Sequence, residues 1–204
     1  MQPVALTDDV VLLDLPGQDD VPAMTLACQD PEVTAWTPLP LPYLAEHAQG
    51  FITAIAPEGW ATGTSLNWAI RELGSEHGLA GMVGLHGVED GSAEIGYWLA
   101  PWARGRGLAG RAAALVLDHA FDRAGLALDR VSWVAYVGNW PSRRLAWRAG
   151  FRVEGTVRGF AVQRGARVDS WLGTLLRDDP REPAEPWPRD APTAATTVRR
   201  TQPS

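Results

Sequence analysis

The stretch Ala93–Phe121 constrains the fold of this chain more than any other, because a strand pattern passes into a helix pattern through a turn rich in glycine and arginine. Its opening segment, AEIGYWL, is rich in β-favouring side chains and is soon followed by a proline. From Leu108 onward the apolar residues recur with a helical period. Glycines let the backbone approach a ligand closely, and the first N–H groups of a helix lack internal partners. The stretch therefore predicts an anion site at the helix start, with a phosphate chain as its natural ligand.

The residues of this turn separate it from other phosphate-binding motifs. A P-loop is excluded because the chain contains no lysine. A Rossmann-type dinucleotide domain conflicts with the antiparallel strands that the sequence predicts before the glycine turn. What is present is R-x-x-G-x-A, from Arg104 to Ala109, directly after the strand EIGYWL. This motif resembles the pyrophosphate-binding motif of the GNAT superfamily of N-acetyltransferases, and the longer AEIGYWLAPWARGRGLA is similar to its RimJ/RimL branch.

A second motif supports the same resemblance. The segment Asn139–Phe151, NWPSRRLAWRAGF, resembles the RimJ/RimL pattern N-x-x-S followed by a helix and Gly-Phe. The resemblance implies an α+β (mixed α/β) GNAT fold, with a central, mostly antiparallel, twisted sheet of about six to seven strands flanked by helices. In that family two strands splay apart at the acyl-CoA cleft, and here those strands would be Glu94–Leu99 and Val131–Val137.

The same resemblance implies how acetyl-CoA is held as cosubstrate. Its pantetheine arm would lie between the two splayed strands as a pseudo-strand. Its pyrophosphate would lie on the backbone N–H groups of the turn, which comprises Arg104, Gly105, Arg106, Gly107, Leu108 and Ala109. Backbone contacts to the arm would come from Trp98, Leu99 and Ala100, and side-chain contacts from Asn139 and Ser142.

The chemistry implied by the family is direct attack of a neutral amine on the thioester in a ternary complex. Ser142 matches the family serine near the sulfur, where it would give a proton or a hydrogen bond to the departing thiolate, although it can equally serve the start of its helix. The glutamate that RimL-like enzymes carry beyond the Gly-Phe falls here at Ala161. We therefore consider three carboxylates as the general base and prefer the first, Glu94, over Asp169 and Glu154.

Glu94 is preferred because its strand borders the thioester, and the competing interpretation is an ordinary strand carboxylate. His86 is expected to face Glu94 near the hairpin turn Glu89-Asp90-Gly91, where it could also serve as a base or lie on a solvated strand face.

The predicted function is transfer of an acetyl group from acetyl-CoA to a primary amine, either a protein N-terminal α-amine or a small-molecule amine. Two alternatives stay open: a transferase that uses succinyl-CoA, and a non-catalytic acyl-CoA-binding or regulatory module. Aromatic side chains are the candidates for lining the substrate cleft, and those we select are Trp36, Tyr97 and Trp133.

Composition narrows the classes of molecule that this protein is expected to bind. The net charge of −6 argues against general nucleic-acid binding, whereas nine of the 18 arginines fall between positions 104 and 152, which suggests one polyphosphate ligand. No apolar run approaches a membrane span and no secretory signal is visible, so we expect no membrane partner. The single cysteine, Cys28, fits a reducing compartment, and we expect a cytoplasmic protein without a metal. The ten tryptophans make a homodimer plausible.

The order of the patterns predicts one domain over residues 1–177. Strands are expected at Val10–Leu15, Leu66–Arg71, Leu79–His86, Ala93–Leu99, Arg130–Val137, Arg152–Arg158 and Val168–Leu176. Helices are expected to begin near Asp19, to span Leu44–Ala56, to end at Gly125 and to follow Pro141. From residue 178 to 204 the chain is proline-rich and polar, which predicts a disordered tail.

Overall fold

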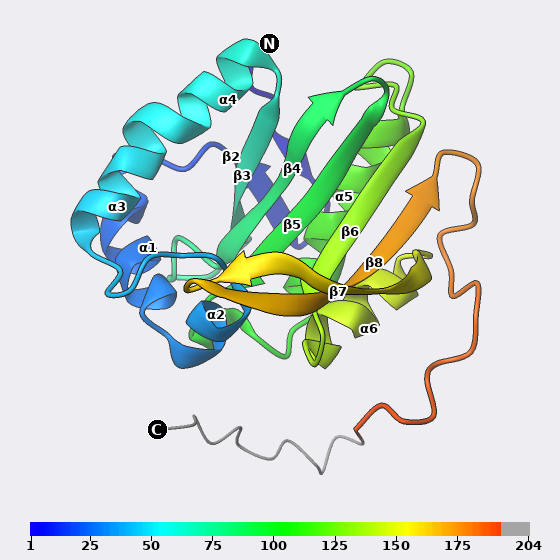
Figure 1. The fold of residues 1–204 in the computed structure, drawn as a ribbon. Coiled ribbons are helices and arrows are strands. Elements are labelled where there is room, and N and C mark those ends of the chain that lie inside the picture. The colour runs from blue at the N-terminus through cyan, green and yellow to red at the C-terminus, as the bar shows by residue number, and fades with distance from the viewer. Residues whose placement is uncertain (193–204) are drawn as a thin grey trace.

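In the computed structural model, which describes residues 1–192, the chain forms one eight-stranded sheet flanked by helices (Figure 1). The strands are β1 (Leu6–Thr7), β2 (Val11–Asp14), β3 (Ser65–Glu72), β4 (Gly81–Glu89), β5 (Ser92–Leu99), β6 (Arg130–Tyr136), β7 (Arg152–Gln163) and β8 (Ala166–Leu176). Their order in the sheet is β1-β2-β3-β4-β5-β6-β8-β7, and every pair is antiparallel except β5 with β6. The predicted fold class is confirmed, and the short β1 is the strand that the sequence pattern did not reveal.

The helices separate onto the two faces of the sheet. In chain order they are η1 (Gln18–Asp20), α1 (Val21–Cys28), α2 (Pro31–Trp36), α3 (Ala45–Gly50), η2 (Phe51–Ile55), α4 (Ala56–Thr62), η3 (Pro101–Ala103), α5 (Leu108–Phe121) and α6 (Trp140–Arg148). Residues of α1, α3 and η2 pack with Ala69, Met82 and Trp98 from the sheet, whereas α5 packs with the alternate residues of the same strands. In Figure 1, α5 accordingly lies behind the sheet and α3 and α4 lie to its other side.

The helix predicted over Leu44–Ala56 continues to Thr62 because the chain accommodates a proline inside it. Pro57 has no N–H to donate, and its ring clashes with the carbonyl four residues earlier in a regular α-helix. The preceding turn, η2, is a π-helical turn in which the N–H of Ala56 donates to the carbonyl of Phe51, five residues back. This wider turn lets the helix pass the proline instead of ending there.

The β7–β8 hairpin is longer than the sequence pattern indicates. Its turn is formed by Arg164 and Gly165, both with positive φ, and the strands run without interruption to either side of it. Of two register shifts in β7, the one between Val157 and Ala161 obscures the alternation of side chains where the segment between the two predicted strands begins. In consequence the hairpin tip reaches α2, where Gln163 donates a hydrogen bond of 2.8 Å to the carbonyl of Ala35.

The segment after β8 departs from the predicted disordered tail. Up to residue 192 it has a defined path that returns past α6 (Figure 1). The indole of Trp147 donates a 2.7 Å hydrogen bond to the carbonyl of Glu185, and Trp187 lies against Trp140 and Trp147. Tryptophan supplies enough apolar area to hold a segment that is otherwise polar and rich in proline. The predicted tail residues 193–204 lie outside the described residues.

Candidate active site

The only parallel strand pair of residues 1–192 is also the one that opens. Strands β5 and β6 pair from Ser92–Arg130 to Ile95–Trp133 and then separate, although each continues to pair with its outer neighbour. We call the space beyond this last pair the β5–β6 cleft; the predicted splaying therefore begins at Gly96 and Val134. A cavity of about 640 Å³ opens there, and its walls include Glu94, Tyr97 and Ser142.

The two faces of the sheet both contribute to this cavity, because side chains alternate along β5. Glu94 and Trp98 belong to the face that carries α1 and α3. Tyr97 and Trp133 belong to the face that carries α5 and α6, where Ser142 lies. The cleft therefore connects a carboxylate on one face with a group of hydroxyls on the other.

The turn Arg104–Ala109, which we call the phosphate turn, has the backbone that its glycines predict. Gly105 and Gly107 have φ of 79° and 77°, a region that residues with a Cβ rarely adopt. Gly107 is the N-cap of α5, and a Cβ at either glycine would have nothing within 4 Å. The first N–H groups of α5 lie at the positive end of the helix dipole, and helical geometry gives them no internal partner.

The guanidinium groups of the phosphate turn are held by carboxylates, which the sequence did not predict. Arg104 donates to Asp30 at 2.6 Å and to Glu32 at 3.0 Å, both at the start of α2. Burial is the largest single influence on the pKa of Asp30 and pushes it upward, but the hydrogen bond and charge of Arg104 and the backbone N–H groups of Val33 and Glu32 together hold that pKa below its usual value. Arg106 pairs with Glu72 and donates to the carbonyl of Trp102 at 2.8 Å. The paired arginines fix the shape of the turn, and the backbone N–H groups are left to meet an anion.

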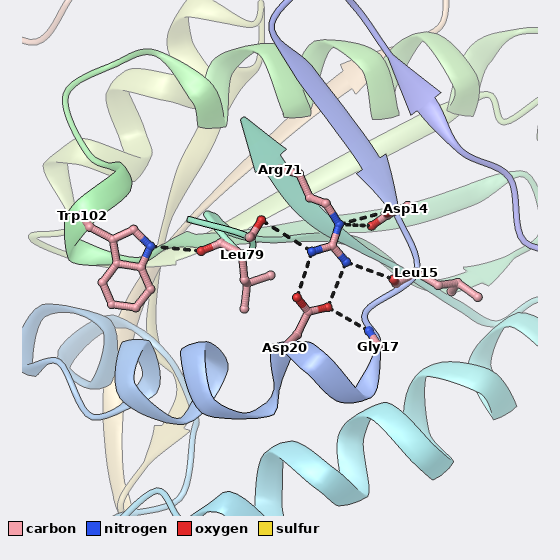
Figure 2. A network of polar contacts seen from close by, with 8 residues as sticks. Asp14, Leu15, Gly17, Asp20, Arg71, Leu79 and Trp102 are labelled. Atoms are coloured by element: carbon pink, nitrogen blue, oxygen red, sulfur yellow. Dashed lines mark hydrogen bonds and ion pairs between the residues drawn. The ribbon is translucent and has the colours of Figure 1, made fainter. Parts of the chain in front are cut away.

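The phosphate turn is further attached to the far edge of the sheet (Figure 2). The indole of Trp102 donates a 3.0 Å hydrogen bond to the carbonyl of Leu79, next to Gly78, whose carbonyl faces Arg71. Arg71 in turn bonds both oxygens of Asp20 and also Asp14. A chain of polar contacts thus runs from β2 and η1 through β3 to the turn.

Ser142 is the centre of the hydroxyl group on the α6 side. Its hydroxyl donates to the Tyr97 hydroxyl at 3.1 Å and accepts from the Trp133 indole at 3.0 Å. Tyr97 donates at 3.1 Å to the Ser142 carbonyl, and burial raises the pKa of Tyr97, so its hydroxyl keeps its proton at neutral pH. The role at the helix start falls to Asn139 instead, whose side chain accepts from the Ser142 N–H at 3.2 Å.

Glu94 and His86 face each other across β4 and β5, as expected, because they are paired in register. Both residues are exposed to solvent, although the cavity walls around them partly desolvate their polar groups. This partial desolvation raises the pKa of Glu94 and lowers the pKa of His86. His86 Nδ1 lies 3.0 Å from the Ser65 hydroxyl, which accepts from Asn67 at 3.1 Å. A polar row therefore crosses three strands and ends at Glu94.

Two glycines leave room for the imidazole of His86 on the sheet surface. Gly84 and Gly96 are paired in the adjacent register position, and a Cβ on them would lie 3.2 Å from His86 Cε1 and 3.4 Å from His86 Nε2, respectively. The ring thus lies along the sheet surface toward the β5–β6 cleft. The sequence carried a signal for this arrangement, namely glycines two residues from His86 and from Glu94 on strands that pair.

The other carboxylates that we considered lie elsewhere. Asp169 accepts from the N–H of Gly159 at 2.7 Å, and Glu154 is bonded to the Thr174 hydroxyl. Neither lines the cavity, whereas Ala161 does, at the position where the RimL-like glutamate was expected. Of the four positions, Glu94 alone brings a carboxylate to the cavity.

The remaining predicted residues divide between the two parts of the site. Trp36 lines the cavity from the end of α2, whereas Trp133 is 1% exposed and presents only an edge of its wall. Trp98 lines the cavity as well. The N–H of Ala100 donates a 2.9 Å hydrogen bond to the carbonyl of Ala80, on the side of β4. Successive residues of a strand direct their N–H and C=O groups to opposite sides, so those of Leu99 point toward the cleft.

Absences help to define the site within the described range. No three His, Cys, Asp or Glu side chains among residues 1–192 are grouped as a metal ion would require. Nor does any helix in that range have the length and apolar character needed to cross a membrane.

Comparison with known proteins agrees with this architecture. A family model described as the acetyltransferase (GNAT) domain matches residues 11–152. YdaF of Bacillus subtilis (strain 168), provisionally named a ribosomal N-acetyltransferase, is 33% identical over 132 residues, which cover 64% of this chain and 71% of YdaF. A crystal structure of a provisionally named acetyltransferase is 26% identical, with a TM-score of 0.74 and coverage of 86% of this chain and 98% of that one.

The fold alone is also shared with Mycobacterium smegmatis RimJ in complex with CoA-disulfide. That structure has 24% identity and a TM-score of 0.74, and the match covers 86% of this chain and 90% of RimJ. The family model spans well over half of the chain and includes the whole phosphate turn and α6. The chain therefore belongs to the GNAT acetyltransferase family.

Proposed function

We propose that acyl transfer takes place in the β5–β6 cleft, with Glu94 as the general base and Ser142 beside the departing sulfur. The overall reaction follows from the family: an acetyl group passes from acetyl-CoA to an amine. The observation that carries the assignment is the end of β5–β6 pairing at Ile95 and Trp133, where the cavity opens between Glu94 and Ser142.

The donor is proposed to lie along the cleft. The pantetheine arm lies along β5 from Trp98 to Ala100 and pairs with the backbone groups of Leu99, which point away from β4, as a peptide does at a sheet edge. The pyrophosphate rests on the N–H groups of the phosphate turn, whose glycines leave the space above them open. Asn139 holds the first turn of α6 and thereby sets the position of Ser142.

In the proposed reaction the amine loses one proton, and the departing sulfur receives a hydrogen bond or a proton. The amine nitrogen attacks the thioester carbon, the new C–N bond forms, and the C–S bond breaks. Glu94 takes the proton that the amine loses, through its raised pKa. The thiolate receives a hydrogen bond or a proton from the Ser142–Tyr97 pair, whose hydroxyls are already linked. Holding both reactants in one cavity supplies the largest part of the rate enhancement.

The acceptor is proposed to be a peptide N-terminal α-amine or a small-molecule primary amine. The name of YdaF refers to ribosomal N-acetylation, which supports a peptide amine for that relative. Acetyl-CoA is the donor that the family supports, and succinyl-CoA is the alternative that a binding experiment separates from it.

Calorimetry with acetyl-CoA, succinyl-CoA and CoA tests the donor site. The key variant is Gly107→Ala, in which the added Cβ disfavours the φ of 77° that opens α5. A left-handed conformation costs a residue with a Cβ about 1–2 kcal/mol, so we expect the acetyl-CoA affinity to fall about tenfold as the turn shifts.

The matched control is Gly63→Ala, which adds the same methyl group at a φ of 74° in the C-cap of α4, away from the phosphate turn. It is expected to lose similar stability and to keep the wild-type affinity for acetyl-CoA. Tighter binding of succinyl-CoA than of acetyl-CoA would identify succinyl-CoA as the donor. No binding of any CoA species by the wild-type protein would overturn the proposed site.

A further inference from the structure

The part of the cavity that the donor leaves free has apolar walls. This inference rests on the proposed function, because it takes the β5–β6 cleft as the place of the pantetheine arm. We call the remaining walls the acceptor half. They come from the sheet face that carries α1 and α3, from the segments that cover this face, and from the β7–β8 hairpin. Their large side chains are Trp36, Leu39, Phe51, Met82, Trp98 and Phe160. A ligand that enters here buries apolar surface.

Within the described chain, two side chains with titratable carboxyl or imidazole groups line the cavity, Glu94 and His86, and the lowered pKa of His86 leaves its imidazole neutral at neutral pH. Burial raises the pKa of Cys28 to about 12 and raises the pKa of Tyr43, so both stay neutral. No arginine lines the cavity in the described range. The two guanidinium groups near α2 are already bonded, Arg104 to Asp30 and Arg164 to the carbonyl of Thr34.

This charge pattern discriminates among amines. A carboxylate next to the reacting amine, as in a free amino acid, would lie near Glu94 with no cation to balance it. The second ammonium of a polyamine would lie against apolar walls, because Glu94 is occupied by the reacting amine. An amine whose neighbouring group is neutral and apolar meets neither penalty.

The hairpin tip limits the size of that neighbouring group. Phe160 and Val162 line the cavity, while Gln163 and Arg164 bond the carbonyls of Ala35 and Thr34. The hairpin is thus attached to α2 on the opposite side of the acceptor half and forms a roof over it. α2 is itself fixed at its other end by Arg104. A compact side chain or ring is the neighbouring group that we expect between these two elements.

We propose that the acceptor is a primary amine whose adjacent group is uncharged, apolar and compact, with an aromatic ring as the best fit. Such an amine occurs both in small arylalkylamines and at peptide N-termini with an aromatic first residue. Free amino acids and polyamines are poor acceptors.

A matched series of amines tests this proposal, with CoA release from acetyl-CoA as the assay. Phenethylamine and phenylalaninamide carry the shared chemistry, the first as a small amine and the second as the model of a peptide N-terminus. Phenylalanine differs from phenylalaninamide only by its carboxylate, and putrescine carries a second amine. We expect kcat/KM for the better of the first two to exceed that for phenylalanine and for putrescine at least about tenfold, and their ratio to each other tells which source is preferred.

A substitution in the cavity wall is expected to change the order in which kcat/KM ranks the amines. Leu39→Arg places a guanidinium in the acceptor half, so kcat/KM for phenylalanine relative to phenylalaninamide should rise at least about tenfold. The control is Leu26→Arg on α1, where the side chain is 60% exposed and does not line the cavity; it should keep the wild-type order. Should Leu39→Arg fail to fold, the wild-type amine series still decides.

The outcomes separate this inference from the proposed function. Acetyl-CoA binding combined with equal or faster turnover of phenylalanine or putrescine overturns the acceptor class alone. Acetyl-CoA binding without turnover of either aromatic amine also overturns the acceptor class. Absence of acetyl-CoA binding overturns the donor site on which both depend.

Discussion

At the scale of single residues, Glu94 shows how a side chain proposed for catalysis can weaken the fold. Its carboxylate stands in a crowded cavity without an ion-pair partner in the described chain, and burial raises its pKa. The folded state therefore binds a proton more readily than the unfolded state does. Stability from this group is present at low pH and is lost as the pH rises from the unfolded pKa through the folded pKa. The same shift brings the base closer to the pH at which it works.

The variant Glu94→Gln tests both consequences. The glutamine cannot accept a proton, so kcat/KM should fall about 10²–10³-fold and lose its rise with pH. The thermal midpoint at neutral pH should increase slightly, because the partial desolvation that raises the pKa of Glu94 disfavours its ionised form. Steady-state kinetics from pH 5 to 9 and thermal unfolding are the measurements.

The control for this variant is Glu89→Gln, an exposed carboxylate at the end of β4, which should change neither property. Unchanged kcat/KM across the pH range in Glu94→Gln would remove Glu94 from the mechanism. His86, with its lowered pKa, would then be the next candidate.

At the scale of elements, α6 is held by a segment that is far from it in the sequence. The helix carries Ser142 toward the cavity, and its outer side meets the chain after β8. Trp187 packs edge-on against Trp140 and Trp147, with ring centroids 6.1 and 5.3 Å away. The Arg144 guanidinium lies 4.9 Å from the centroid of the Trp187 ring. These contacts restrict the helix from the side opposite to the cleft.

We expect Trp187→Ala to destabilise the protein by about 1–3 kcal/mol, because it removes an aromatic cluster and a cation–π contact together. Urea unfolding measures the change, and limited proteolysis should cleave the chain after β8 more rapidly. Glu182→Ala, an exposed change in the same segment, should leave both unaltered. Equal stability of the Trp187 variant would mean that the segment does not brace α6.

At the scale of the whole molecule, one guanidinium joins parts of the chain that the sequence keeps apart. Arg71 on β3 is bonded to Asp14 at the end of β2 and to Asp20 at the start of α1 (Figure 2). The hydrogen bonds that Arg71 donates to Asp20 hold the pKa of Arg71 above its usual value. Asp20 is only 4% exposed, so its charge depends on this partner. Through Gly78 and Leu79 the same network reaches Trp102, beside the phosphate turn.

Arg71→Met should therefore destabilise the protein by about 3–5 kcal/mol, since it leaves a buried carboxylate without its cation. Adding Asp20→Asn should recover part of that loss, which identifies the uncompensated charge as its main source. Urea unfolding of the two single variants and the double variant completes the cycle. Additive losses, without recovery, would contradict the pairing as the cause.

The sequence by itself determined the local features of the donor site. The pattern from AEIGYWL to α5 specifies a strand, a turn with two glycines of positive φ and a helix, and all three depend on neighbouring residues. The same holds for the start of α6, where Asn139 and Pro141 set the first turn. The antiparallel order of β3, β4 and β5 follows from short connections, so it could be predicted as well.

Tertiary structure decided what depends on residues far apart in the chain. Arg104 and Arg106 look like free phosphate ligands in the sequence, but α2 and β3 bring carboxylates to them. Tyr97 and Ser142 are 45 positions apart and meet because β5 and α6 border the same cleft. The contacts of the segment after β8 are of the same kind: composition reports what a segment can bury alone, whereas Trp187 packs on tryptophans of α6. Neighbouring residues determine local backbone conformation, but ion pairs, cavities and packing partners exist only once the sheet has formed.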